Sequence, residues 1–165
     1  MLNVVRWGKA KQSADRLTKD YRTPPIPALE IAERRGVNVV FAEFNEFRDD
    51  VSGYCDFVNK RLYVNAEDRI QRQNFTIAHE LGHWILHRED FERDPGRYQF
   101  LPRFTEPDQS DAFEKEANQF AANLLVPEKL LRPVIRLPPS RLADMFQVSK
   151  LMMEWRVKNV ARRSA

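Results

Sequence analysis

Apolar residues recur at helical spacing in two long stretches of the chain. The first stretch covers 69–87 and the second covers 109–125, and each places its apolar side chains along one face of a helix. The first apolar face consists of Phe75, Ala78, Gly82, Ile85 and Leu86, and the second consists of Phe113, Ala117, Phe120, Ala121 and Leu124. The spacing therefore predicts two half-buried helices, each of which needs a hydrophobic partner surface.

Strand-forming residues lie between the N-terminal region and the first of these helices. Residues 37–44 predict one strand, and residues 54–58 and 61–65 predict two more, joined as a hairpin by a two-residue turn. Residues 49–53 are rich in turn formers and predict a turn before the hairpin. Residues 88–108 are polar and interrupted by proline, which predicts a long loop that acts as a lid or binding segment.

Shorter helices are predicted towards both ends. Residues 1–23 are polar and mixed in charge, and they predict a loosely packed helix. A second helix is expected over 27–35, with Gly36 ending it. Near the C-terminus, two short helices are expected over 140–146 and 149–160.

The 165-residue chain can bury a core of its own, since 42% of its residues are hydrophobic and 31% are charged. Cys55 is the single cysteine, so an internal disulfide is excluded. No apolar run approaches 18 residues, and the first ten residues lack the apolar segment of a signal peptide. We therefore expect a cytoplasmic protein with no membrane association, in which Cys55 is a structural thiol.

Charge is distributed unevenly along the chain. Residues 129–165 contain nine lysines and arginines against two acidic residues, whereas residues 89–116 contain nine acidic residues against four basic ones. Residues 142–157 also resemble a helix-turn-helix, with an L-A-x-x-F-x-V-S start. This tail predicts either contact with DNA or a DNA-bound regulator, or a helical hairpin packed on the core. The packing residues of that hairpin would be Leu142, Phe146, Met152 and Trp155.

Candidate chemistry lies in the first long helix, where residues 79–83 read H-E-x-x-H. Histidines four residues apart project from one helix face, so His79 and His83 can bind one zinc ion. Glu80 is then the general base that activates water for peptide hydrolysis. His87 lies four residues further on, but one straight helix is poorly suited to wrap three ligands around one ion. We therefore expect His87 to support the site or cap the helix.

A catalytic zinc site needs a third protein ligand. Every histidine of the chain lies in the first long helix, so we expect this ligand to be a carboxylate. The second long helix supplies Glu114 and Glu116, which lie on opposite edges of its apolar face. Periodicity alone therefore leaves both residues open as the ligand.

Two segments carry a family resemblance, F-T-I-A-H-E-L-G-H at 75–83 and E-A-N-Q-F-A-A-N-L-L-V-P at 116–127. They resemble the paired motifs of the ImmA/IrrE family of zinc metallopeptidases, and the chain is similar to the short, ImmA-like form. The resemblance implies one zinc ion per chain, with Glu116 as the third ligand beside the two histidines. It also implies a protein substrate, a DNA-binding helix-turn-helix repressor whose cleavage derepresses phage, mobile-element or stress-response genes.

The expected fold class is α+β, a minimal zincin-like domain with a small, mainly antiparallel sheet packed on the H-E-x-x-H helix, plus a C-terminal helical hairpin. We expect three parts. They are an N-terminal helical extension at 1–23, a zinc metallopeptidase domain at 24–130 and a basic, helix-turn-helix-like tail at 131–165.

The expected activity is that of a zinc-dependent endopeptidase. The alternative is a regulatory or toxin–antitoxin binding module whose zinc site is structural or weakly active. An endopeptidase also needs a second group that stabilises the oxyanion. The candidates are Tyr54, Tyr98 and the arginines of 88–108.

Overall fold

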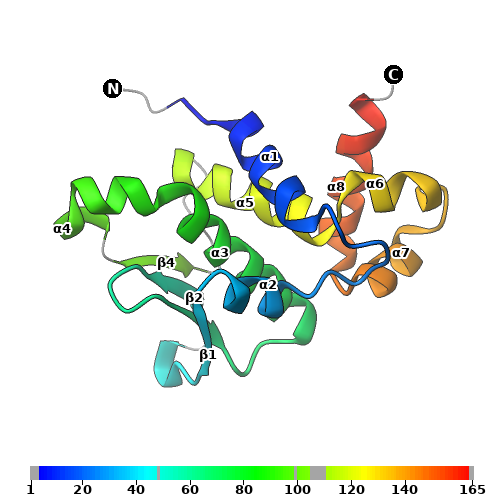
Figure 1. Ribbon diagram of the computed structural model, residues 1–165. Helices are drawn as coiled ribbons and strands as arrows, with labels where there is room; N and C mark the ends of the chain where they lie inside the picture. The colour runs from blue at the N-terminus through cyan, green and yellow to red at the C-terminus, as the bar shows by residue number, and fades with distance from the viewer. Residues whose placement is uncertain (1–3, 48, 99, 105–110, 164–165) are drawn as a thin grey trace.

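The fold is seen in a computed structural model (Figure 1), which describes residues 4–47, 49–98, 100–104 and 111–163. For 97–98 and 100–104, the description covers the backbone alone. A small sheet lies on one side of the molecule and the long helices lie on the other (Figure 1).

The sheet has four strands within the described ranges. Their spatial order is β1 (Asn38–Ala42), β3 (Arg61–Asn65), β2 (Val51–Asp56) and β4 (Phe100–Phe104). β1 pairs with β3 in parallel, whereas the β3–β2 and β2–β4 pairs are antiparallel. The prediction of a small, mainly antiparallel sheet is therefore confirmed, and β2 and β3 form the predicted hairpin. A short 3-10 helix, η1 (Asn45–Phe47), lies between β1 and β2.

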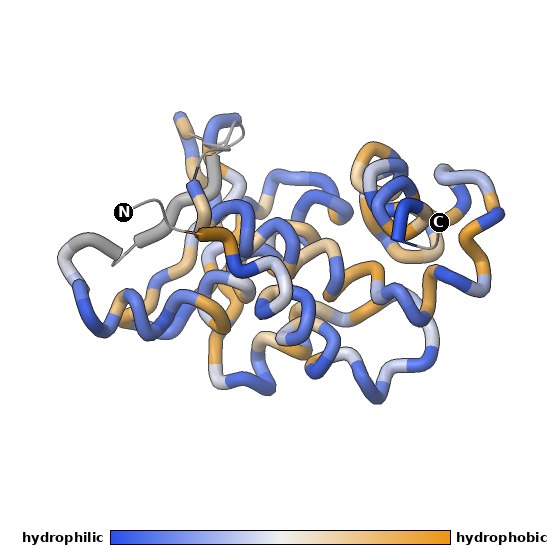
Figure 2. The backbone as a smooth tube through the Cα atoms, turned by 90° about the horizontal axis from the view of Figure 1, so that it is seen from above, coloured by the Kyte–Doolittle hydropathy of each residue, from blue (hydrophilic) through white to orange (hydrophobic). Residues whose placement is uncertain are grey.

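Two long helices form the centre of the molecule. α3 (Ile70–Arg93) packs on β2 and β3 with one face and on α5 (Ala112–Leu125) with another. The buried hydrophobic core includes Cys55, Leu62 and Val64 of the sheet and Ile77, Ala78 and Leu81 of α3. Both predicted long helices are confirmed. Seen from above, hydrophobic and hydrophilic residues alternate along the helices, as amphipathic packing requires (Figure 2).

Residues 88–108 differ from the predicted long loop. α3 continues to Arg93, and α4 (Pro95–Tyr98) and β4 follow it, while 105–108 lie outside the described residues. Phe91 explains the longer helix, because its ring stacks on Phe57 with 5.2 Å between centroids. Val51 pairs with Phe104, so β2 begins inside the segment predicted as a turn. Both differences arise from tertiary partners that local sequence cannot show.

The N-terminal helix, α1 (Trp7–Thr18), is packed more firmly than predicted. It lies against α5, and Ala10, Ala14 and Thr18 are buried. α2 (Ala28–Arg34) is confirmed, and Gly36 follows it with a φ of 80°, which glycine adopts without steric strain.

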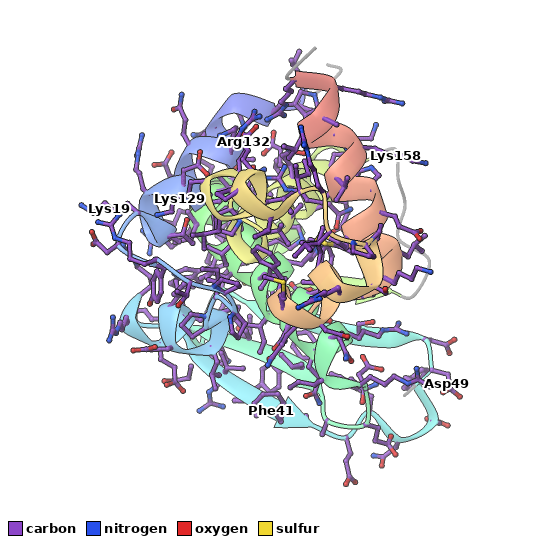
Figure 3. The ribbon with its side chains drawn as sticks, turned by 90° about the vertical axis from the view of Figure 1, so that its right-hand side faces the viewer. Lys19, Phe41, Asp49, Lys129, Arg132 and Lys158 are labelled. Carbon is purple, nitrogen blue, oxygen red and sulfur yellow. The ribbon has the colours of Figure 1, made fainter. Side chains whose placement is uncertain are left out.

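After α5, the chain forms α6 (Glu128–Leu131), the 3-10 helix η2 (Arg132–Val134), α7 (Pro139–Phe146) and α8 (Lys150–Arg163). Figure 3 shows Lys129 beside the end of α1, where its Nζ donates to the carbonyl oxygens of Thr18 and Lys19. The helical hairpin of α7 and α8 is confirmed, and the predicted packing residues Leu142 and Phe146 are buried. On α8, however, Met153 is buried in place of Met152, and Trp155 is 47% exposed.

Arg156 fastens this hairpin to the centre of the molecule. Its guanidinium is buried and donates to the carbonyl oxygen of Val126 and to Oδ1 of Asn123, at the C-terminal end of α5. Burial lowers the pKa of Arg156 to about 10. The division at 23/24 and 130/131 stays a prediction. Among the described helices, none is long and apolar enough to cross a membrane.

Candidate metal centre

The three functional side chains of the H-E-x-x-H motif point into the interior of the protein. His79, Glu80 and His83 are all fully buried on α3. The two histidines lie one helical turn apart, as the spacing predicts, and their Nε2 atoms are 3.1 Å apart. Two imidazole nitrogens therefore meet at one point inside the protein.

Glu114 of α5 completes a group of three. Its Oε1 lies 2.9 Å from Nε2 of His83, and its Oε2 lies 3.2 Å from Nε2 of His79. One ligand atom from each residue falls within 4.8 Å of the other two. A two-histidine, one-carboxylate set is a donor set of catalytic zinc sites. Two imidazole nitrogens and a carboxylate oxygen that meet at one point are ligands that a divalent metal ion accepts, so these residues fit such an ion.

Close packing of α3 against α5 places Glu114 there. A Cβ built on Gly82 would lie 3.0 Å from Cδ1 of Phe120 and 3.2 Å from Cα of Ala117, so the helices approach where α3 lacks a side chain. Asp111, three residues before Glu114, caps α5 with its side chain, which accepts from the backbone N–H of Phe113.

The electrostatics of Glu114 agree with a role as a charged ligand. Burial alone would raise the pKa of the Glu114 carboxyl. Hydrogen bonds from His79 and His83 outweigh burial and hold that pKa well below its ordinary value. The carboxylate is therefore ionised where it meets the two ring nitrogens.

The structure does not bring Glu116 to these histidines, contrary to our expectation. Its Oε1 accepts from the backbone N–H of Arg6 at 2.8 Å and from Nε at 3.0 Å, and its Oε2 accepts from Nη2 at 2.8 Å. Oε2 also lies 2.9 Å from Nε2 of His87. Burial raises the pKa of Glu116, but the bonds to His87 and Arg6 lower it to about 2. Residues two apart point to different sides of a helix, so Glu114 and Glu116 meet different partners.

Two further side chains hold the imidazole rings. Oδ1 of Asn118 lies 2.9 Å from Nδ1 of His79, and Nδ1 of His87 lies 2.8 Å from Nδ1 of His83. Burial lowers the pKa of His87 to about 4, so its ring is neutral at pH 7. Sequence reasoning anticipated a supporting role for His87. It gave no signal for Arg6, which lies 110 residues before Glu116.

Glu80 lies between α3 and the sheet. Cys55 of β2 is fully buried, and burial raises the pKa of its thiol, with a further contribution from the charge of Glu80. Cys55 is therefore protonated and unsuited to act as a nucleophile.

Tyr54 faces away from the metal centre. A Cβ on the neighbouring Gly53 would point at Thr76 of α3, and side chains alternate along a strand. The Tyr54 ring stacks instead on Tyr63, with 4.5 Å between centroids. The side chain of the other tyrosine candidate, Tyr98, lies outside the described residues.

The arginine candidates do not supply an oxyanion donor in the described part of the chain. Arg88 covers the ring of Trp84 at 5.1 Å, and Arg93 lies 3.8 Å from Glu89 on the surface. The side chains of Arg97 and Arg103 lie outside the described residues.

Comparison with known proteins finds a curated relative and similar solved structures. The metallopeptidase ImmA of Bacillus subtilis (strain 168) is 26% identical over 113 residues, which cover 64% of this chain and 60% of that protein. The chain thus spans less than two thirds of that relative. A Mycobacterium tuberculosis transcriptional regulator superposes with a TM-score of 0.62 at 19% identity, over 88% of this chain and 45% of that one. At that identity, the likeness shows the fold alone.

A family model covers most of the chain. Residues 32–158 match the model described as the IrrE N-terminal-like domain, peptidase family M78. The match includes α3 and α5, which carry the two histidines and Glu114. The chain therefore belongs to the ImmA/IrrE family of metallopeptidase domains.

Proposed function

We propose that the protein is a zinc-dependent endopeptidase in which His79, His83 and Glu114 hold the metal ion. The observation that carries the proposal is the convergence of the buried His79 and His83 and the half-buried Glu114 on one point. Zinc, when bound, supplies a Lewis acid that polarises the scissile carbonyl and makes water more acidic. Three protein ligands suit a catalytic site, whereas structural zinc sites use four.

Glu80 is the proposed general base. Its carboxylate accepts a proton from the attacking water and then delivers that proton to the leaving amine. The side chain of Glu80 is fully buried, and the low dielectric constant of a buried site strengthens the interaction of its charge with the reacting atoms.

A protein substrate follows from the peptidase assignment, and we propose a helix-turn-helix repressor in the cytoplasm. The family resemblance supports this class of substrate, and cleavage would derepress phage, mobile-element or stress-response genes. A single buried cysteine agrees with a reducing compartment.

The test replaces Glu80 and measures zinc and cleavage separately. The purified protein is incubated with a repressor encoded by a neighbouring gene. Glu80→Gln should lower cleavage about 100- to 10,000-fold, as loss of a general base does, while zinc content stays at the wild-type level. Glu30→Gln, on the exposed face of α2, is the matched control and should cleave normally. Unchanged cleavage by Glu80→Gln would exclude the proposed base.

The alternative function is a regulatory or toxin–antitoxin binding module. The same incubation separates the two, since a cut that a chelator abolishes supports the peptidase and a stable, uncut complex supports the module.

Contact with DNA through α8 is favoured by the outward position of Lys158 (Figure 3) and by the exposed Arg162 and Trp155. Replacing Lys158 and Arg162 with alanine should then weaken salt-dependent binding to random duplex DNA, whereas Lys9→Ala on α1 should not.

A further inference from the structure

The face of the sheet that points away from α3 carries aromatic side chains, whereas a sheet face open to water ordinarily carries polar ones. The half-buried rings of Tyr54 and Tyr63 stack with 4.5 Å between centroids, and the half-buried ring of Phe44, just after β1, lies 6.1 Å from Tyr54. Phe47 of η1 is 56% exposed. The long helices lie on the other side of the sheet (Figure 1). Aromatic rings gathered on an open face are typical of a surface that binds another protein.

Acidic residues alternate with these rings along the chain. Residues 43–50 contain four acidic residues and one arginine, and all four acidic residues are exposed: Glu43, Glu46, Asp49 and Asp50. Figure 3 shows Asp49 at the outer edge of the molecule. We call this surface, residues 43–50 together with Tyr54 and Tyr63, the aromatic–acidic face. Its charge is therefore opposite to that of the C-terminal tail.

The chemistry of the aromatic–acidic face selects a basic protein as its partner. Carboxylates repel the phosphates of nucleic acid and attract lysine and arginine side chains. Aromatic rings between the carboxylates add apolar surface for the aliphatic stems of those side chains, and their faces attract the cationic heads. A partner that presents lysines and arginines together on one surface therefore complements this face in both charge and polarity.

The proposed substrate has such a surface. A helix-turn-helix repressor concentrates lysine and arginine where it contacts the phosphates of DNA. We propose that the aromatic–acidic face docks the basic, DNA-binding face of the repressor. This inference rests on the proposed function for the class of substrate. A repressor face that is bound here is not available to DNA, so the peptidase captures repressor that has left its operator.

Docking on this face is compatible with cleavage at the metal centre on the other side of α3. An extended chain spans up to about 3.5 Å per residue, so about ten residues of a repressor linker reach across a domain of this size. The docked domain and the scissile bond therefore occupy different places on the peptidase. The aromatic–acidic face should accordingly contribute to the affinity for intact repressor and leave the chemical step unchanged.

The first test measures binding of the intact repressor encoded by a neighbouring gene to the full-length Glu80→Gln variant, which should leave it uncut. Adding Glu43→Lys and Glu46→Lys should lower the association rate constant about tenfold at low salt, and the difference should shrink at high salt. Adding Phe47→Ala instead should raise the Kd about 5- to 30-fold, since it truncates an exposed aromatic anchor. Unchanged binding in both variants would overturn the proposal.

The matched control makes the same change of net charge elsewhere. Asp20→Lys and Glu33→Lys replace two exposed acidic residues outside the aromatic–acidic face, and this double variant should bind the repressor as its parent does. An equal loss of binding in the control and in the Glu43→Lys, Glu46→Lys variant would mean that net charge alone governs association, which would overturn docking at this face.

The second test separates docking from chemistry in the protein with Glu80 intact. Phe47→Ala should raise KM for cleavage of intact repressor about 5- to 30-fold with kcat unchanged, and cleavage of a short peptide spanning the cut site should stay normal. A fall in kcat on both substrates would overturn the proposal. If the wild-type protein cut neither substrate, the peptidase assignment would fail, while the binding measurement would still decide whether the repressor docks.

The third test identifies the surface of the repressor that is bound. Excess operator duplex should displace the repressor from a peptidase that carries Lys158→Ala and Arg162→Ala, changes that remove the proposed contact of α8 with DNA. A complex of all three molecules would show that another surface of the repressor is used, which overturns the proposal. If Glu43→Lys and Glu46→Lys instead dissociated an oligomer of the peptidase alone in analytical ultracentrifugation, a second copy would occupy the face and the proposal would be wrong.

Discussion

α5 presents two carboxylates to α3, the half-buried Glu114 and the buried Glu116, and their surroundings differ. Glu116 accepts from three donors of Arg6, so the guanidinium already balances its charge. Glu114 meets two imidazole nitrogens, which supply no fixed positive charge while the rings are neutral. A cation at Glu116 would have to displace an arginine, whereas a cation at Glu114 would complete the set. Burial alone therefore does not identify a ligand, since the charge of the neighbouring groups decides.

The largest effect expected from this comparison is on zinc binding. Glu114→Ala removes one of three ligands and should weaken zinc binding about 100- to 1,000-fold, since structural zinc sites bind with about 10–16 kcal/mol shared among their ligands. Competition with a chelator measures the constant. Glu116→Ala is the paired variant and should lose far less. A greater loss in Glu116→Ala would restore Glu116 as the ligand and reverse the comparison.

The next effect concerns the contact that brings Glu114 to the histidines. Gly82→Val places a branched side chain against Phe120 and Ala117 and should destabilise the fold by about 1–3 kcal/mol, as overpacking does. Zinc affinity should fall as well, because the helices must separate. Denaturant unfolding measures the first quantity and chelator competition the second.

Gly8→Ala is the matched control for that contact. Gly8 also lies in a helix, α1, but a Cβ added there meets no atom within 4 Å. The substitution should stabilise the protein by about 0.5–1 kcal/mol, because alanine favours a helix over glycine. If Gly82→Val and Gly8→Ala had the same effect on stability and zinc affinity, the close packing of α3 on α5 would not be the cause of the position of Glu114.

A smaller effect is expected at the partner of His79. Asn118→Ala removes the acceptor of the Nδ1–H and should weaken zinc binding about tenfold. Asn118→Asp keeps an oxygen in place and should bind zinc more tightly than the alanine variant. Equal affinities for both variants would mean that Asn118 packs against the ring without orienting it.

The smallest effect is expected on the opposite face of the sheet. Tyr54→Phe preserves the stack on Tyr63 and removes only a hydroxyl that faces away from α3. The kcat/KM for peptide cleavage should therefore not change. A marked loss would show that Tyr54 reaches the reaction, and the two faces of the sheet would no longer be functionally distinct.

Much of the fold follows from local sequence. The period of the apolar residues predicts α3 and α5, and Gly36 marks the end of α2 because few other residues adopt its positive φ. The length of α3 could not be read in this way. Its last turns are stabilised by the ring of Phe91 on Phe57, a residue that is 34 positions earlier, in the turn between β2 and β3.

For the metal centre, the sequence by itself determined the pair of histidines and the adjacent glutamate, because a helix places residues four apart on one face whatever surrounds it. It left the choice between Glu114 and Glu116 open, and the family resemblance favoured Glu116. Only the tertiary structure shows that Glu114 is the glutamate that lies beside both histidines. Arg6 reaches Glu116 from 110 residues away, and the lack of a side chain at Gly82 lets α5 approach closely enough for Glu114 to meet His79 and His83.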